Sequence, residues 1–359
     1  MKWSNQITQL IGTEYPIVQA PMFGVTTPEM VISASRAGAL GSLSLGDLSA
    51  DRCSDLIRST AASLKTPFAV NIFVNAIPEI SADLRVQYNE TKAFVEELAR
   101  EHGLEVALPA LDSIRITDYR EQIDAILAHS CKVVSFTFGN LDAQSIKRLK
   151  DKEVTIIGTC TSVIEAIALE EAGIDIICVQ GLEAGGHRGS FDEKPVPEIG
   201  GFSLLPQVKE QVRVPLIYAG GLYNGRTIHS AKLLGAAGFQ IGSLLLKSKE
   251  SALHDFEKKR LSQVRESDIV LTRSFSGRYA RGVKNTFIEV LDASQKILPY
   301  PYQNKLTGEL RKVARAHQMV DFVNIWAGQS IHPYSEQSTQ DIIRHLIREV
   351  EILHSSLDV

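Results

Sequence analysis

The chain has 359 residues, a formal net charge of −4 and a pI near 6.2. Acidic and basic residues are interspersed, so the sequence offers neither the basic surface typical of a nucleic-acid-binding protein nor a polybasic membrane signal. Hydrophobic residues make up 44% and charged residues 22% of the chain, as in globular proteins with a large core. We therefore expect no nucleic-acid partner and no membrane partner.

The first residues contain no long apolar run, and no stretch approaches the roughly 18 uncharged apolar residues that a membrane span needs. We therefore expect neither a signal peptide nor a transmembrane helix. The cysteines are widely spaced, without a CxxC or Cys/His pattern, which predicts reduced thiols and no metal site. They are Cys53, Cys131, Cys160 and Cys178. These features favour a cytoplasmic protein.

Short, continuously apolar runs recur along the chain and predict parallel strands that are covered on both faces. The eight runs begin at Ile17, Ala39, Phe68, Val133, Thr155, Ile176, Pro215 and Gly238. Helical patterns lie between them. Eight alternations of strand and helix predict an α/β fold that closes into a (β/α)8 TIM barrel. An open, doubly wound sheet is the alternative, and it requires a break in strand order that a sequence does not show.

Several of the intervening helices have recognisable ends. After the first strand, Thr27 is a suitable N-cap, Pro28 suits the first helical turn, and Gly38 ends the helix. The helical patterns over 161–172 and 224–234 are likewise each followed by a glycine. These helix-capping and helix-ending residues support the alternation of strands and helices.

Two segments depart from this rhythm, and a helix closes the chain. Residues 104–129 are interpreted as a loop or excursion rather than a ninth barrel strand. Residues 249–303 form a longer insertion of helical and loop character, and 338–353 form a closing amphipathic helix that begins with a capping box. We therefore expect the barrel over 1–248 and 304–359, with the insertion covering the active site.

Glycines follow the seventh and eighth predicted strands, where barrels of this kind commonly hold phosphate. Gly221 lies in YAGGLYNGR, and Gly242 and Ser243 lie in QIGS. Glycines let backbone N–H groups approach a phosphate, and the start of a helix adds favourable partial charge. Tight turns also use glycine for steric reasons alone, but two such turns at consecutive strand ends favour a phosphate site.

The sharpest pattern is QGLEAGGHRGSF, directly after the sixth strand. Three glycines within five positions surround His187. An imidazole changes protonation near neutral pH, which suits a proton acceptor or a hydrogen-bond donor to an anion. The simpler alternative is a histidine that caps a turn. Its position at the carboxyl end of a barrel strand favours the catalytic interpretation.

The segments QAPMFGV, NIFV, QGLEAGGHRG, AGGLYNGR and QIGS occur in this order, and over nearly its whole length the chain resembles the nitronate monooxygenases, formerly called 2-nitropropane dioxygenases. YPYQNKLTGELR and WAGQ resemble the class I branch in particular. The resemblance implies an FMN cofactor. It also implies oxidation of alkyl nitronates, and potentially of nitroalkanes, by O2 to carbonyl compounds and nitrite. The glycine-histidine loop is less specific, because related flavin-dependent quinone and enoyl reductases have similar loops.

The resemblance implies roles for individual residues, with His187 as the catalytic histidine. The residues that match flavin-binding positions are Met22, Asn71, Gln180, Gly185, Gly221, Gln240, Ile241, Gly242 and Ser243. The resemblance also places Tyr300, Tyr302 and Lys305 over the flavin as substrate-binding residues, although ordinary loop surface is the alternative. Arg188, beside the histidine, is interpreted as a partner in a surface ion pair.

One departure from the family pattern concerns substrate preference. Many class I members carry a histidine after the fourth strand, where this chain has Thr137. The pocket therefore lacks a second imidazole, which leaves the fine substrate preference open but not the binding of flavin.

Two rival functions remain at this point. An NAD(P)H-dependent flavin reductase, acting on a quinone or an enoyl thioester, would use the same barrel, although no GxGxxG segment follows a strand and opens a helix. A barrel without flavin, such as an aldolase or isomerase, usually needs a Schiff-base lysine or an acidic base on a strand, and the predicted strands offer neither. The sequence does not specify the oligomeric state.

Overall fold

The computed structural model describes residues 3–193, 195–331 and 333–357. Eight parallel strands form its main sheet: β1 (Ile17–Gln19), β2 (Ser42–Gly46), β3 (Ala69–Phe73), β4 (Val133–Thr137), β5 (Thr155–Cys160), β6 (Ile176–Gln180), β8 (Leu216–Ala219) and β9 (Gly238–Ile241). Their order is β1-β9-β8-β6-β5-β4-β3-β2. A parallel bridge between Val18 and Leu40 joins the two ends of this order. The predicted barrel is therefore confirmed, and the open sheet is excluded.

The amino-terminal end of the barrel is plugged by α1 (Gln6–Ile11). Ile7 and Ile11 are buried in one cluster with inward-facing strand residues such as Val133 and Ile176. The plug is tied down by Thr155 Oγ1, which donates to the Leu10 carbonyl at 3.0 Å. Burial of these apolar side chains closes this end, so the carboxyl ends of the strands are left to form a site.

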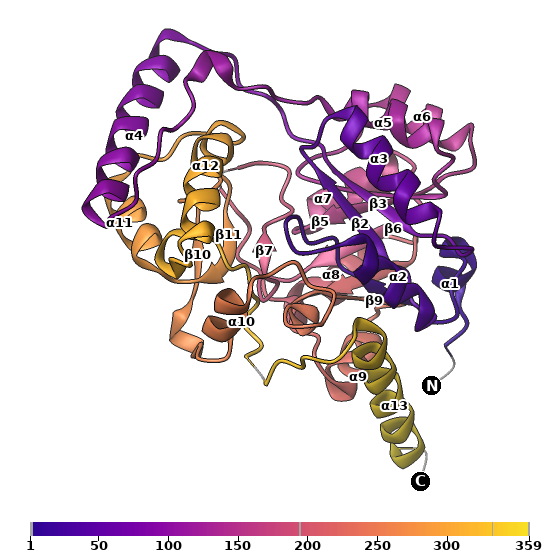
Figure 1. Cartoon of the computed structure of the whole chain (residues 1–359). Helices are drawn as coiled ribbons and strands as arrows, with labels where there is room; N and C mark the ends of the chain where they lie inside the picture. The colour runs from indigo at the N-terminus through magenta and orange to yellow at the C-terminus, as the bar shows by residue number, and fades with distance from the viewer. Residues whose placement is uncertain (1–2, 194, 332, 358–359) are drawn as a thin grey trace.

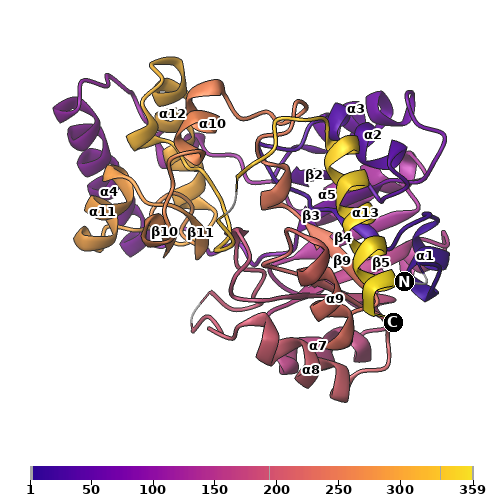
Figure 2. The ribbon, with the colours of Figure 1, turned by 90° about the horizontal axis from the view of Figure 1, so that it is seen from below.

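Helices surround the barrel (Figures 1 and 2). They are α2 (Pro28–Arg36), α3 (Ala50–Ala61), α5 (Tyr119–Ala128), α6 (Ala143–Lys150), α7 (Val163–Glu171), α8 (Gly201–Gln211), α9 (Gly225–Leu233) and α13 (Thr339–Leu357). The predicted N-caps Thr27 and Ser338 are confirmed. The Thr27 side chain accepts from the Met30 N–H, and the Ser338 hydroxyl accepts from the Asp341 N–H. A hydroxyl at this position satisfies a backbone donor that the first turn leaves unpaired.

A second body, which we call the lobe, stands beside the barrel mouth. Figures 1 and 2 show α4, α11 and α12 grouped with β10 and β11, away from the main sheet. The helical elements are α4 (Ala82–Glu101), η1 (Leu111–Ser113), α10 (Asp255–Leu261), η3 (Glu266–Asp268), α11 (Thr286–Ser294), α12 (Tyr302–Ala316) and η4 (Val320–Phe322). The turn η2 (Ser243–Leu245) leads out of β9. The lobe has its own buried apolar cluster.

The lobe draws on more of the chain than the predicted insertion 249–303. Helix α4 enters it from between β3 and β4, and α12 packs into it through Leu306 and Leu310. The segment 104–129, interpreted from sequence as an excursion, is divided between the two bodies. Leu104 is buried in the lobe, whereas α5 packs with Ile123 in the barrel core. Which body a helix joins depends on long-range packing, and helical periodicity does not encode it.

A three-stranded antiparallel sheet connects the two bodies. Its order is β10 (Ile269–Thr272), β11 (Ala280–Val283) and β7 (Gly186–His187). Strand β7 belongs to the loop after β6 of the barrel, and Ala280 of the lobe lies opposite His187. The glycine-histidine loop is thus an edge strand of the lobe. Among the residues described, no helix has the length and apolar character needed to cross a bilayer.

Candidate active site

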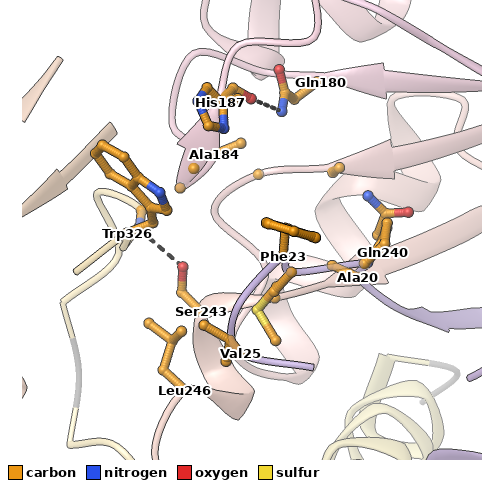
Figure 3. Close-up of a pocket in the computed structure, with 18 of the residues that line it drawn as sticks. Ala20, Phe23, Val25, Gln180, Ala184, His187, Gln240, Ser243, Leu246 and Trp326 are labelled. Carbon is orange, nitrogen blue, oxygen red and sulfur yellow. Dashed lines mark hydrogen bonds between the residues drawn. The ribbon is translucent and has the colours of Figure 1, made fainter. Parts of the chain in front are cut away.

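A cavity lies between the carboxyl ends of the barrel strands and the lobe. Barrel residues from the ends of β1, β3, β4, β6, β8 and β9 line one side, and lobe residues such as Tyr300, Arg311 and Trp326 line the other. Figure 3 shows His187 and Gln180 at one end and Ser243, Val25 and Leu246 at the other. Both bodies are therefore needed to complete the site.

The structure brings most of the predicted flavin-site residues to this cavity. Those that line it are Met22, Asn71, Gln180, Gly185, Gly221, Gln240, Gly242 and Ser243, together with His187 and Tyr300. Ile241 does not line it, because its side chain is fully buried in the barrel core. The Ile241 carbonyl instead accepts from the Ala20 N–H at 2.8 Å, which holds the first strand end against the last.

The turns at Gly221 and Gly242 could hold a phosphate group. Strands β8 and β9 are paired, so the two turns are neighbours. Gly221 has a φ of +69°, which favours glycine, and a Cβ there would meet nothing closer than 3.7 Å. Ser243 directly follows Gly242 in the chain, and its Oγ accepts from the Gly328 N–H at 2.9 Å. Open glycine backbone and a hydroxyl at adjacent strand ends fit the phosphate of a mononucleotide.

Gln180 holds the glycine-histidine loop with both the nitrogen and the oxygen of its side-chain amide. Its Nε2 donates to the His187 carbonyl at 2.9 Å, and its Oε1 accepts from the Gly189 N–H at 2.8 Å. Figure 3 shows the first of these bonds. Gly185 serves the same loop sterically, since a Cβ there would lie 2.5 Å from the Gly328 nitrogen. Both residues line the cavity, and both also fix the position of His187.

His187 is enclosed by aromatic rings. The ring centroids of Phe138 and Trp326 lie 5.5 and 5.7 Å from that of its imidazole, and those of Phe73 and Tyr300 both lie at 6.4 Å. Burial, together with the positive charges of Arg278 and Arg311, lowers the pKa of His187 to about 3. The imidazole is therefore neutral at pH 7 and has a lone pair available to accept a proton.

Arg311 is a partly buried cation of the cavity that the sequence analysis missed. Its Nη2 donates to the Asn304 carbonyl at 2.8 Å and to Asn304 Oδ1 at 2.9 Å, and its Nη1 lies 3.4 Å from Asn324 Oδ1. Desolvation, together with the positive charge of Arg315, lowers its pKa to about 10, so it stays charged at neutral pH. No carboxylate among the described residues forms an ion pair with it. A charge that is partly removed from water and has no ion-pair partner is costly, so this position favours an anionic ligand.

Tyr300 adds a hydrogen-bond donor to the same cavity. Its side chain is 1% exposed, and its hydroxyl has no hydrogen-bond partner within the described part of the chain. Burial raises the pKa of Tyr300, so the hydroxyl keeps its proton. A protonated, unpaired hydroxyl near a guanidinium suits the oxygen atoms of an anion.

Tyr302 and Lys305, predicted to lie over the flavin, do not reach the cavity. The Tyr302 hydroxyl donates to the Pro78 carbonyl at 2.7 Å, and Lys305 Nζ forms an ion pair with Asp47 Oδ2 at 2.6 Å. The reason is helix register. Asn304 and Arg311 are seven residues apart on one face of α12, and Lys305 is rotated about 100° away from Asn304. The seven-residue spacing of Asn304 and Arg311 was therefore the sequence feature that could have pointed to Arg311.

Arg188 is not in a surface ion pair, so that interpretation is wrong. It is 1% exposed, and its guanidinium donates to the carbonyls of Gly181 and Gln180 at 2.6 and 3.1 Å. Arg278 is also buried. It lies 4.3 Å over the Phe138 ring and donates to the carbonyls at the far end of the same loop. The two arginines satisfy carbonyls of a loop that has little regular secondary structure.

The fold and the site define a (β/α)8-barrel enzyme whose active site is completed by a lobe. A family model described as nitronate monooxygenase matches residues 4–349. The chain is 36% identical over 353 residues to a probable nitronate monooxygenase of Staphylococcus saprophyticus, covering 97% of this chain and 98% of that protein. The identity to a probable nitronate monooxygenase of Staphylococcus aureus is 36% over 349 residues, covering 96% and 97%.

Solved structures agree with these sequence comparisons. A nitroalkane oxidase from Streptomyces ansochromogenes superposes with a TM-score of 0.89 at 31% identity, covering 98% of this chain and 100% of that one. FabK from Thermotoga maritima has a TM-score of 0.74 at 23% identity, covering 99% and 98%, and shares the fold. The chain belongs to the nitronate monooxygenase family and is an oxidoreductase.

Proposed function

We propose that this protein is an FMN-dependent nitronate monooxygenase that oxidises alkyl nitronates with O2 to carbonyl compounds and nitrite. Its family and its structural similarity to a nitroalkane oxidase support oxidation of this substrate class. The observation that carries the proposal is that neutral His187 and cationic Arg311 line one cavity with the glycine turns after β8 and β9. One cavity thus offers a base, an anion site and a phosphate site.

The residues at the strand ends fit FMN. The backbone at Gly221, Gly242 and Ser243 would hold its phosphate, and Met22 and Asn71 would lie beside its ring system, as the family resemblance implies. The bound flavin supplies an electron acceptor for the nitronate and a site of reaction with O2. The paired turns after β8 and β9 provide for one phosphate, which supports FMN over FAD.

The protein's own groups bind the substrate and handle its proton. Arg311 and the Tyr300 hydroxyl attract the nitronate oxygens, and attraction is strong here because the cavity wall has a lower effective dielectric than water. His187 accepts the proton when the substrate is a neutral nitroalkane. The aromatic rings around it exclude water from the reacting carbon. Thr137 lines the cavity where many class I members have a second imidazole.

One experiment separates this function from its nearest rival. Nitrite release and O2 consumption are measured with a preformed nitronate such as propane-2-nitronate, and NAD(P)H oxidation is measured with the same flavin-loaded preparation. We expect nitrite in proportion to the nitronate consumed. If NAD(P)H is oxidised with a quinone or an enoyl thioester and no nitrite forms, the protein is a flavin reductase instead.

The proposed reaction needs only a small nitronate and O2 as partners. A cytoplasmic location is part of the same proposal, and its support is the free, buried state of all four cysteines. Alkylation of the unfolded protein, isolated from cells under acid, would measure whether the thiols are reduced in vivo.

A further inference from the structure

The hydroxyl of Ser276 lies between His187 and a backbone carbonyl. Its Oγ is 2.8 Å from His187 Nε2 and 2.9 Å from the Arg278 carbonyl oxygen, and the Arg278 N–H approaches it at 3.3 Å. A serine hydroxyl has one proton, and a carbonyl can only accept. The Ser276 proton is therefore committed to the Arg278 carbonyl. It follows that His187 Nε2 is the donor in the remaining bond and carries the proton of the neutral imidazole.

The backbone around Ser276 keeps this hydroxyl in place. The Gly277 N–H donates to the Arg273 carbonyl at 2.8 Å, and the Arg273 Nε–H donates back to the Gly277 carbonyl at 2.8 Å. Gly277 has a φ of +88°, and a Cβ there would lie 2.5 Å from the Leu298 carbonyl oxygen. The tight turn is thus closed by two hydrogen bonds and requires glycine.

The backbone of His187, the hydrogen-bond partner of Ser276, is also held in place. Strand β7 pairs with β11, which puts Ala280 opposite His187, and the Arg188 N–H donates to the Tyr279 carbonyl at 2.8 Å. The backbones that carry Ser276 and His187 are therefore neighbours in one small sheet. The bond between their side chains depends on this pairing and not on a mobile loop.

The other ring nitrogen, Nδ1, is available to the substrate. The His187 side chain lines the cavity, and no hydrogen bond to its Nδ1 is present among the described residues. We propose that Ser276 is a positioning residue that fixes the Nε2–H tautomer of His187, so that Nδ1 is the nitrogen that takes the substrate's α-proton. The catalytic part of this proposal rests on the proposed function, whereas the tautomer does not.

The proton step balances without any rearrangement of the loop. The α-proton of a neutral nitroalkane moves to Nδ1, and the electron pair of the C–H bond stays with the substrate, which becomes the nitronate. The resulting imidazolium keeps its Nε2–H bond to Ser276. The positive charges of Arg278 and Arg311 oppose this protonation, and the nitronate formed beside the ring offsets them.

The tautomer is measured directly by 15N NMR of the histidine ring in the flavin-loaded protein, where the two nitrogens are distinguished by their chemical shifts and couplings. We expect Nε2 to be protonated in the wild type and in Ser276→Thr, which keeps the hydroxyl. In Ser276→Ala we expect a mixture of the two tautomers. Ser274→Ala is the matched control, because this buried hydroxyl of the same turn bonds to Asp292 and not to His187.

Kinetics then test the consequence. Ser276→Ala should lose about tenfold in kcat/KM with a neutral nitroalkane, the size expected for one hydrogen bond that holds the correct tautomer. With a preformed nitronate the loss should be less than about threefold, and Ser276→Thr should restore most of the activity. A proton on Nδ1 in the wild type, or an unchanged tautomer in Ser276→Ala, would overturn the proposal. If the wild type oxidises neither substrate, the proposed function fails while the spectra still decide the tautomer.

Discussion

His187→Asn keeps a polar side chain of similar reach but removes a base that can take up a full proton. We expect the flavin to stay bound and the turnover of a neutral nitroalkane to fall about a hundred- to ten-thousand-fold, the usual contribution of a well-placed general base. A preformed nitronate has already lost its proton, so its turnover should fall much less. Oxygen consumption with both substrates measures the difference. Equal losses would argue against a role in proton transfer, and no loss would reduce His187 to a loop residue.

Arg311→Met removes a positive charge from the cavity and keeps most of the side chain's length. The apparent affinity for nitronate should fall by about tenfold or more, the size of a charge-assisted hydrogen bond, and its dependence on salt should weaken. Lys305→Met is the matched control on the same helix. Lys305 pairs with Asp47 outside the cavity, so its loss should change the nitronate affinity less than about threefold.

Steady-state kinetics at two salt concentrations compare the two variants. The prediction fails if Arg311→Met and the wild type have the same affinity and salt response. A larger effect for Lys305→Met than for Arg311→Met would support Lys305 as the substrate-binding residue, as the sequence resemblance implied.

At the scale of elements, Gly185→Ala tests how the loop after β6 is fitted to the lobe. A Cβ would lie 2.5 Å from the Gly328 nitrogen and 2.6 Å from the Ala327 carbonyl carbon, and backbone atoms cannot move aside cheaply. We expect a loss of about 1–3 kcal/mol in the free energy of unfolding, as for other overpacked positions. Turnover should fall as His187 shifts. Chemical denaturation and nitrite release measure both. Gly200→Ala is the control, because Gly200 has a φ of −65° and a Cβ there would meet nothing closer than 3.5 Å.

The barrel elements could be predicted because their signals are local. Each apolar run became a strand, although the second begins at Ser42 and not at Ala39, where only a bridge through Leu40 forms. The lobe could not be predicted in the same way. Helix α4 is mostly polar, and its buried face meets residues about 200 positions later in the chain. His187 and the glycine turns lie in sequence motifs. Arg311 and Ser276 lie in no such motif, and packing brings them to the cavity and to His187.

At the scale of the whole molecule, the cofactor should be FMN and should stabilise both bodies together. Heat release followed by chromatography should yield FMN, and the finding of FAD or of no flavin after reconstitution would contradict the proposal. Because a ligand that binds only the folded state stabilises it by mass action, FMN at a hundred times its Kd should add about 2.7 kcal/mol. Thermal unfolding with and without FMN measures the gain, and riboflavin, which lacks the phosphate, is the control.

The small sheet β10-β11-β7 has a consequence for protein engineering. Since the barrel's histidine strand is hydrogen-bonded at the edge of the lobe, the lobe cannot be exchanged as a removable cap. Consider a chimera in which α10 to α12 come from a relative and the loop 181–191 comes from this protein. Its β11 and β7 would come from two different proteins, although they must pair with each other. Grafts that carry the loop and the lobe as one unit should preserve the position of the imidazole, whereas grafts of either part alone should displace it.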